Sequence, residues 1–413
     1  MSFLTRIGKA LGISSPKPPP PYKGNQNSCK VTKTRPVYSG QTHSLPSRRH
    51  SQFNKTPRQK SHIQKSGPSE GEPSVVYDPT HMPEKLDRKV AEGGEGAVWT
   101  LENPKLRGSV VKVFRAHKLR EPGFVTETEQ KIRAIRVIKN NDRSMAWPYF
   151  PVYSARKQFI GFAMRRVEGK QLSTVMHPLA SKPICGDWNR GDYVRLSVDL
   201  VRKVETLHQL GIVLGDLNPN NFLVDIASRS LLFVDMDSYQ FTLNGRTFRC
   251  PVGMPEYTPP EYQGRNFKTF DRTQESDYFA AAVLIFQILM RGKLPFDIVG
   301  GEGPVINIRN GNFPYGTSQG SLIPKGNWIL LWSHLPRRVK DMFHRAFIDG
   351  VKDPSARPNL NDWLDVLTIY LSDARKGWHD LSLTPTNFKT RSYQGRNVVP
   401  GRGRGYESHH LTA

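Results

Sequence analysis

The sequence predicts an α+β fold with two lobes, a small antiparallel β-sheet with one helix followed by a mainly helical lobe, and disordered tails at both ends. Three observations predict it. Short β-rich runs separated by turn residues dominate the chain from about residue 86. Long helical patterns dominate it from about residue 193. Both ends of the 413-residue chain are basic, polar and poor in periodic apolar residues.

The tails are predicted from composition and charge. Residues 1–75 contain 13 Lys/Arg against two Glu, and they include the run PKPPPP. The stretch from about residue 387 has five Lys/Arg against one Glu and contains GRGRG. Such segments bury too little apolar surface to offset the entropy lost on ordering. The tails therefore carry +11 and +4 of the formal net charge of +24, which leaves about +9 on the body.

The mobile positive charge predicts an acidic partner or an anionic surface for the tails. Nucleic acid is one candidate, although no zinc-ligand spacing or stacking-aromatic motif accompanies the charge, and a merely solvated tail is the alternative. Residues 1–13, MSFLTRIGKALGI, have apolar residues at helical spacing, which suggests peripheral association with a membrane surface.

Cysteine usage and hydropathy predict a cytoplasmic protein without a transmembrane segment. The three cysteines, Cys29, Cys185 and Cys250, lie far apart and form no C-x-x-C pair. The longest apolar stretch, YFAAAVLIFQILM from Tyr278, is shorter than the roughly 20 residues that a bilayer requires. It is therefore interpreted as a buried helix.

Each lobe is predicted from its pattern of apolar residues. VAEGGEGAVWTL, GSVVKVF and QFIGFAMRRV read as strands, and FVTETEQKIRAIRVI between the last two reads as a helix packed on their sheet. YVRLSVDLVRKVETLHQL then begins a helical lobe. The polar loop LGDLNPNNFLV, residues 214–224, interrupts this lobe, and helices resume from Glu275.

A phosphate site is predicted at the glycine-rich turn AEGGEGAV. Backbone N–H groups at glycine can approach phosphate oxygens because no Cβ intervenes, although such a turn is often only structural. Lys112 lies on the next strand between apolar neighbours, where a cation needs an anion, and a phosphate would supply it. Glu129 on the following helix is best spaced to hold Lys112, and Glu127 is the alternate.

A metal site is predicted from oxygen ligands on two neighbouring loops. Asp216 and Asn221 lie in the polar loop, and Asp235 ends the apolar strand of LLFVDMDSY. Magnesium takes carboxylate and amide oxygens and keeps water and substrate phosphates for its other positions. A pair of Asx-rich turns is the alternative interpretation.

The order of these parts resembles that of the eukaryotic-like (Hanks-type) protein kinases over residues 86–384. The resemblance implies that Lys112 holds the ATP phosphates, that Glu129 pairs with Lys112, and that Asp216 is the catalytic base. It also implies that Asn221 and Asp235 bind Mg²⁺, or Mn²⁺ in its place. The glycine loop over ATP would comprise Ala91, Gly93, Gly94, Gly96 and Val98.

Further matches extend the resemblance to the second lobe. GMPEYTPPE resembles the end of an activation segment, with Glu261 as its structural glutamate and Arg357 of DPSARP as the partner of Glu261. Asp277 at the start of the apolar helix also matches. Met164 would gate the adenine pocket, with Arg165 to Val167 as the hinge.

The implied division is a disordered region over residues 1–85, a kinase N-lobe over 86–167, a C-lobe over 168–384 and a disordered Arg/Gly-containing tail over 385–413. Within the family, LGDLNPNNFLVD and CPVGMPEYTPPE look most like a divergent bacterial signalling branch. Besides protein substrates, the resemblance to that branch implies two partners. They are a metal-dependent protein phosphatase and a von Willebrand A-domain protein.

Several positions depart from the family pattern. Leu214 and Gly215 replace the His and Arg of H-R-D, and Asp237 replaces the Gly of D-F-G. Asn218 and Met254 replace a Lys and a Thr that organise the acceptor hydroxyl in Ser/Thr kinases.

The sequence therefore favours an ATP- and Mg²⁺-dependent Ser/Thr protein kinase that does not depend on an arginine-linked phosphorylation switch. A nucleotide-binding pseudokinase scaffold and a small-molecule kinase are the alternatives.

Overall fold

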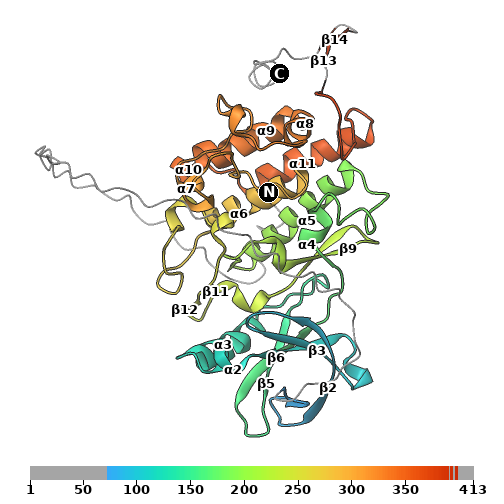
Figure 1. Cartoon of the computed structure of the whole chain (residues 1–413). Coiled ribbons are helices and arrows are strands. Elements are labelled where there is room, and N and C mark those ends of the chain that lie inside the picture. Colours follow the sequence, from blue (N-terminus) through green and yellow to red (C-terminus); the bar gives the residue numbers. More distant parts are fainter. Residues whose placement is uncertain (1–71, 390, 394–395, 399–413) are drawn as a thin grey trace, which may run out of the picture. The chain divides into compact units, whose positions relative to one another are not determined.

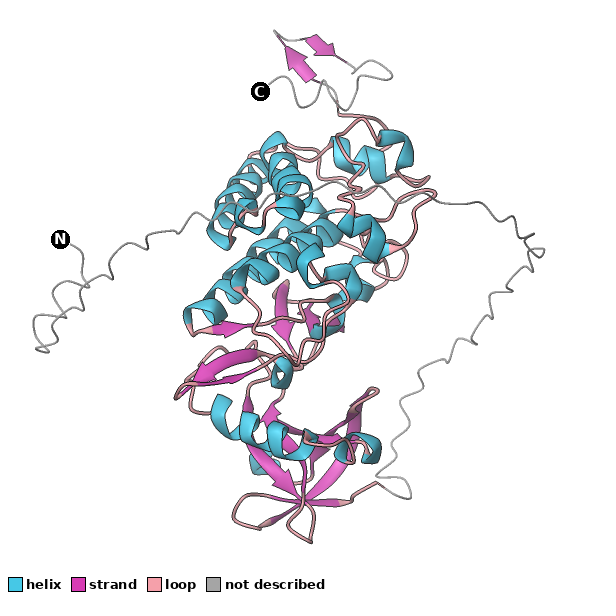
Figure 2. Ribbon diagram, turned by 90° about the vertical axis from the view of Figure 1, so that its left-hand side faces the viewer, coloured by secondary structure: helices cyan, strands magenta, loops and turns pink. Residues whose placement is uncertain are grey.

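The computed structural model describes residues 72–389, 391–393 and 396–398. The basic N-terminal tail up to residue 71 and the possible membrane-surface helix of residues 1–13 lie outside these described residues. Within them the chain forms a β-barrel with helices on it, followed by a mainly helical part (Figures 1 and 2).

The first lobe is a closed antiparallel barrel with strand order β1-β2-β3-β4-β6-β5. Its strands are β1 (Val75–Tyr77), β2 (Pro83–Glu92), β3 (Gly96–Leu101), β4 (Ser109–Phe114), β5 (Pro148–Tyr153) and β6 (Phe159–Arg165). One side of the barrel wall buries a cluster around Trp99, Val111 and Ala163, and the other buries a cluster around Phe162 and Met164. The alternation of the strand residues between these two clusters follows the two-residue period of a strand.

Ordered structure begins earlier than the predicted boundary at residue 86. The short strand β1 pairs with β2 on one side and, through Tyr77 and Tyr153, with β5 on the other. This pairing closes the predicted open sheet into a barrel and removes its edges. At the other end, β13 (Arg391–Tyr393) and β14 (Arg396–Val398) pair inside the segment that was expected to be disordered.

Two helices accompany the barrel instead of the predicted one. α2 (Ala116–Leu119) is a single turn directly after β4, and α3 (Phe124–Ile135) is the predicted helix. α3 follows Gly123, whose φ of +79° belongs to the left-handed region that favours glycine. Its buried residues Ile132 and Ile135 face the core, together with the cationic residue Lys131.

The second lobe is built around two long helices. α5 (Arg190–Gln209) begins with a capping box in which Asn189 and Asp192 each bind the other's backbone. α6 (Gln274–Leu289) is apolar on nearly all sides and is buried, as the sequence predicted. Shorter helices and a third long one complete the lobe, namely α4 (Leu172–Met176), α7 (Pro304–Arg309), α8 (Trp328–Ser333), α9 (Arg337–His344), α10 (Gly350–Lys352) and α11 (Leu360–Arg375).

Two small sheets provide loops at the boundary between the lobes. Their strand orders are β10-β9-β7 and β12-β11-β8. The strands are β7 (Lys170–Gln171), β8 (Ile212–Val213), β9 (Phe222–Asp225), β10 (Ser230–Phe233), β11 (Gln240–Leu243) and β12 (Arg246–Phe248). Among the helices that the structure describes, none is both long enough and apolar enough to cross a bilayer.

Candidate active site

The glycine-rich turn joins β2 to β3 as predicted, but its glycines differ in purpose. A Cβ on Gly93 or Gly94 would meet no atom within 4 Å. The Gly93 N–H donates to the Gly96 carbonyl at 2.9 Å, and its own carbonyl accepts from Arg115 Nε at 2.9 Å. A Cβ on Gly96 would instead clash with the carbonyl oxygen of Val113 on β4. Gly96 is therefore required for the packing of two strands. Ala91 lies on β2 opposite Val98 of β3.

Lys112 projects from β4 into a cluster of three carboxylates. Its Nζ lies 3.0 and 3.1 Å from the two carboxylate oxygens of Asp237, 3.3 Å from Asp235 Oδ1 and 3.9 Å from Glu95 Oε2. Burial by itself would lower the pKa of Lys112, but the attraction of Asp237, Asp235 and Glu95 outweighs burial and raises this pKa. Lys112 is therefore fully charged at neutral pH.

Neither predicted partner of Lys112 on α3 contacts it, which corrects the assignment of Glu129. The Glu129 carboxylate accepts hydrogen bonds from Tyr153 Oη at 2.7 Å and from Arg133 Nη2 at 2.9 Å, on the outside of the barrel. Burial and the bond to Glu129 raise the pKa of Tyr153 to about 12. The alternate, Glu127, is exposed. The rotation of α3 about its axis explains the error, because this helix turns Lys131 inward instead.

Asp216 and Asn221 meet in the loop between β8 and β9. Asn221 Nδ2 donates to the backbone oxygen of Asp216 at 2.8 Å and to its Oδ2 at 3.2 Å. Asp216 Oδ1 is buried and has no hydrogen-bond partner within the described part of the chain. An unpaired buried carboxylate oxygen is costly unless a ligand group completes it. A substrate hydroxyl would do so.

Asp235 sits beside this loop through a backbone contact, because the Val234 N–H donates to the Asn221 carbonyl at 3.0 Å. Its φ of +54° is in the left-handed region, which Asp tolerates better than most residues, and its side chain is half exposed. Across residues 72–389, no group of three or more His, Cys, Asp or Glu side chains forms a complete metal cage. Asp235 and Asn221 offer a carboxylate and an amide oxygen, the types of protein ligand that Mg²⁺ takes together with substrate phosphates.

Asp277, on α6, binds the backbone of the loop that carries Asp216. Its carboxylate accepts hydrogen bonds from the backbone N–H of Leu214 at 2.7 Å and of Gly215 at 2.8 Å. His208 Nε2 lies 2.9 Å from the same carboxylate. Asp277 is 1% exposed, so these contacts are charge-assisted hydrogen bonds in a dry environment. They fix the backbone of the two residues that directly precede Asp216.

The residues predicted to contact adenine are mostly apolar. Met164 is buried, and Val98, Val167 and Val234 are among the partly buried residues that pack against its cluster. The Arg165 N–H donates a hydrogen bond to the Trp147 carbonyl at 3.0 Å. The backbone of Val167, in contrast, makes no hydrogen bond to any residue that the structure describes, so its N–H and C=O are open to a flat heterocycle.

Glu261 and Arg357, placed together by the sequence resemblance, form a two-pronged ion pair. Arg357 Nη1 and Nη2 lie 2.7 Å from Glu261 Oε1 and Oε2, respectively. The Arg357 side chain is fully buried and also donates to the carbonyls of Gly350 and Glu275. The pair therefore fastens the end of the activation segment to the start of α6 and the turn before α11.

Lys131 ties α3 to the segment between Asp235 and Glu261. Its buried Nζ donates to the carbonyl of Ser238 at 2.9 Å and to that of Arg249 at 2.8 Å. Burial lowers the pKa of Lys131 to about 8, although Cys250, Asp237 and Glu127 oppose this shift and Arg272 adds to it. One side chain thus joins both ends of the β11–β12 hairpin to the N-lobe.

Arg272 occupies the space beside Gly215, where the arginine of the family motif is missing. It donates to the carbonyls of Gly215 and Val252, and its guanidinium carbon lies 3.8 Å from the centroid of the Phe267 ring. Gly215 has a φ of +73°, and a Cβ there would lie 2.8 Å from Arg272 Nη1 and 2.9 Å from Cys250 Cβ. The replacement of arginine by glycine therefore makes room for Arg272, which joins the catalytic loop to the activation segment.

Comparison with known proteins agrees with this geometry. The family model for the protein kinase domain matches residues 85–364. The chain belongs to the protein kinase family. It is 31% identical over 315 residues to Protein kinase YegI of Escherichia coli strain K12, a match that covers 73% of this chain and 47% of the relative.

Other relatives of this chain are bacterial as well as plant proteins. Protein kinase YegI of Escherichia coli O157:H7 is 30% identical over 303 residues, which covers 70% of this chain and 45% of the relative. Serine/threonine-protein kinase pkn3 of Myxococcus xanthus is 28% identical over 227 residues, or 52% of this chain and 38% of the relative. The chain spans about half the length of the two YegI relatives and belongs to the bacterial-type branch of the family.

Sequence reasoning missed four residues of the site. The sequence pattern presents Asp237 only as the replacement of a family glycine, although a buried Lys112 requires a carboxylate and Asp237 is the nearest one in sequence to Asp235. Glu95 lies inside the glycine-rich turn and ion-pairs with Lys112 and Lys118. Lys131 and Arg272 gave no signal, because their partners are backbone carbonyls far away in the chain.

We predict that Asp237→Asn weakens MgATP binding and turnover at least 10-fold, because Lys112 loses its closest carboxylate and its position. The matched change Glu129→Gln should alter both less than 3-fold, since Glu129 lies outside the cleft. Calorimetric titration with MgATP and steady-state kinetics measure the two effects. The reverse order of sensitivity, with Glu129→Gln the more damaging, would restore the partner expected from the family.

The lowered pKa of Lys131 predicts that the free energy of unfolding rises with pH. Between about pH 8, its folded pKa, and pH 10.5, its ordinary value, the unfolded chain holds a proton that the folded chain has released. The free energy of unfolding should therefore rise across this window relative to Lys131→Met, by an amount on the order of 3 kcal/mol. Urea unfolding of both proteins at pH 7.5 and at about pH 10 gives the difference. Parallel pH profiles for the two proteins would contradict the lowered pKa.

Proposed function

We propose that this chain is an ATP- and Mg²⁺-dependent protein kinase that transfers the γ-phosphoryl group to serine or threonine hydroxyls of proteins. The observation that carries the proposal is the state of Asp216. One of its carboxylate oxygens is held by Asn221 at 3.2 Å, and the other is buried and unpaired among the described residues. A general base needs such an oriented oxygen within reach of the proton that it takes.

The residues divide the reaction between them. Lys112 binds and orients the phosphates of ATP, and Val167 offers its backbone to the adenine edge. Asp216 takes the proton of the acceptor hydroxyl as that oxygen bonds to the γ-phosphorus and the bond from phosphorus to the bridging oxygen of ADP breaks. Asn221 keeps the Asp216 carboxylate in place. Mg²⁺ held by Asp235 and Asn221 would neutralise charge on the phosphate oxygens.

Specificity for serine or threonine acceptors is supported by similarity to a named relative, and one feature of the loop around Asp216 opposes it. A relative that matches 52% of this chain carries the name serine/threonine-protein kinase. Asn218, however, caps the turn of the catalytic loop by accepting from the Asn220 N–H at 3.0 Å and donating to the Asp216 carbonyl at 3.3 Å. It therefore shapes the loop, and this observation favours a nucleotide-binding scaffold as the second candidate function.

Partners and location follow from the same proposal. Proteins are the acceptors, and the resemblance to the bacterial branch supports a metal-dependent protein phosphatase and a von Willebrand A-domain protein as associates. A cytoplasmic location agrees with the use of ATP, and Cys185 and Cys250 are buried free thiols.

We expect Asp216→Asn to lower kcat at least 100-fold while the affinity for MgATP changes less than 3-fold, because the base acts only in the chemical step. Labelled ATP, a generic Ser/Thr protein acceptor and phosphoamino-acid analysis provide the assay. Asp365→Asn, an exposed aspartate on α11, is the matched control. Equal transfer by the native chain and Asp216→Asn would sink the kinase proposal, and nucleotide binding without any transfer would support the scaffold.

The activation segment supports activity without an arginine-linked phosphorylation switch. Its hairpin is stabilised by the stacking of Phe241 on Phe248, whose ring centroids lie 5.0 Å apart. Its later part is held by the Tyr257 hydroxyl, which donates to Gln287 at 2.7 Å. Two basic residues that could receive a phosphate are already engaged. Arg249 binds Asp271 at 2.7 Å, and Arg246 donates to Gln130.

Combined replacement of Ser238, Thr242 and Thr247 by Ala should leave the initial rate within 3-fold of the native rate after phosphatase treatment. Arg272→Met should lower the rate at least 10-fold, because the catalytic loop loses its tie to the segment. Rates on an external protein acceptor test both changes. A 10-fold loss in the triple variant, with rescue by acidic replacements, would show that a phosphate orders the segment after all.

A further inference from the structure

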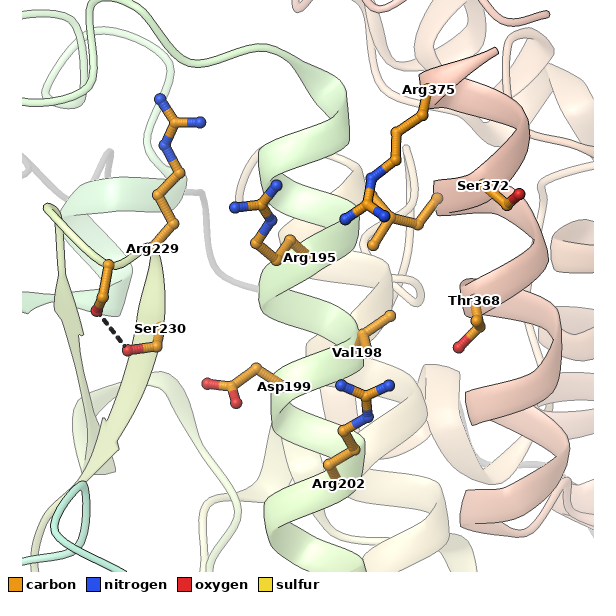
Figure 3. A pocket seen from close by; sticks show the side chains of 11 residues that line it. Arg195, Val198, Asp199, Arg202, Arg229, Ser230, Thr368, Ser372 and Arg375 are labelled. Carbon is orange, nitrogen blue, oxygen red and sulfur yellow. Dashed lines mark hydrogen bonds between the residues drawn. The ribbon is translucent and has the colours of Figure 1, made fainter.

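A polar cavity lies apart from the residues of the candidate nucleotide site. It has a volume of about 380 Å³ and is bounded by α5, α11 and the turn between β9 and β10 (Figure 3). None of the residues assigned to ATP, metal or catalysis lines it. Its volume falls at the lower end of the roughly 300–1,000 Å³ typical of small-molecule sites.

Arginine dominates the wall of this cavity. Arg195 and Arg202 come from α5 two turns apart, Arg375 comes from the last turn of α11, and Arg229 comes from the β9–β10 turn. Figure 3 shows Arg375 extending from α11 toward α5 and Arg202 extending from α5 toward α11. Three segments that are distant in sequence therefore bring cationic groups to one hollow.

The charge of the cavity is not balanced by its own carboxylates. Arg229 is paired with Asp187 and Asp192, each at 2.8 Å. Within the part of the chain that the structure describes, Arg195, Arg202 and Arg375 form no ion pair.

Asp199 is the acidic residue in the wall, and it is already occupied. Its Oδ2 accepts from Lys203 Nζ at 2.8 Å and from the Leu231 N–H at 2.7 Å. Asp199 is therefore engaged by Lys203 and a backbone group, and an excess of positive charge remains in the cavity.

Three guanidinium groups around one hollow repel one another, and a doubly charged anion would relieve that repulsion. The planar fork of Arg matches phosphate oxygens with paired hydrogen bonds, and the hydroxyls of Ser230, Thr368 and Ser372 add further donors in the same wall. A nucleic-acid strand fits less well, because such strands use stacking aromatic side chains and the wall contains none.

We propose that this cavity binds a dianionic phosphate group, with Arg195, Arg202 and Arg375 as its principal ligands. The source of the group is a phosphorylated side chain of a protein or free inorganic phosphate. The inference does not depend on catalysis, because the cavity and the cleft share no residue.

The test uses the full chain at constant ionic strength. Inorganic phosphate, a phosphoserine peptide and its unphosphorylated form are titrated by calorimetry into the native protein and into R195Q/R202Q/R375Q. The matched control, R136Q/R156Q/R338Q, removes the same charge from exposed arginines elsewhere. Lys112→Met removes phosphate binding at the cleft, and R195K/R202K/R375K keeps the charge of the cavity but not the fork.

We expect the Gln triple to lose at least 10-fold in affinity for the phosphorylated probes, the Lys triple to lose part of it, and the control and Lys112→Met to keep it. Tighter binding of the phosphopeptide than of phosphate would identify a protein source, and equal binding would identify free phosphate. Equal loss in the control triple, or no binding at millimolar phosphate, would overturn the proposal. So would arginine-dependent binding of a U-rich oligonucleotide that phosphate does not compete.

Discussion

The ion pair between Lys112 and Asp237 is the contact on which the site depends. Lys112 is buried in the barrel wall, and an ammonium group there costs several kcal/mol unless carboxylates compensate it. The compensation comes from residues 235 and 237, which follow β10 in the other lobe. The cation that would orient the phosphates therefore also fixes the loop that carries the candidate metal ligand, so the N-lobe and the metal site are positioned together.

The activation segment is held by side chains that bind backbone rather than by a phosphate. Lys131 reaches the carbonyls of Ser238 and Arg249 from α3, and Arg272 reaches those of Gly215 and Val252. These contacts use donors that are always present near neutral pH, because the guanidinium of Arg remains charged and either form of Lys can donate. Gly215 and Arg272 therefore depend on each other, because a side chain at residue 215 would occupy the space that Arg272 fills.

Helix α5 connects the chemistry with the arginine cavity. At its C-terminal end His208 contacts Asp277, which holds the backbone before Asp216. On another face of the same helix, Arg195 and Arg202 line the cavity. A single rigid helix with one buried face and one solvent-facing side can serve two sites, since its core packing fixes both sets of side chains at once.

The sequence by itself determined the order of the elements and most of the residues proposed for the candidate site. Lys112 could be assigned as a cation between apolar neighbours on a strand. Asp216, Asn221 and Asp235 could be assigned from their polar loop patterns, and Glu261 with Arg357 could be paired by motif. The partner of Lys112 could not, because the choice among Glu129, Glu127 and Asp237 depends on how α3 is rotated. The tertiary structure likewise decided three other features. They are the closure of the barrel by β1, the hydrogen bonds of Arg272 to the carbonyls of Gly215 and Val252, and the proximity of Arg195, Arg202 and Arg375. All of them join segments that only three-dimensional packing brings close, and no local pattern along the chain records such distances.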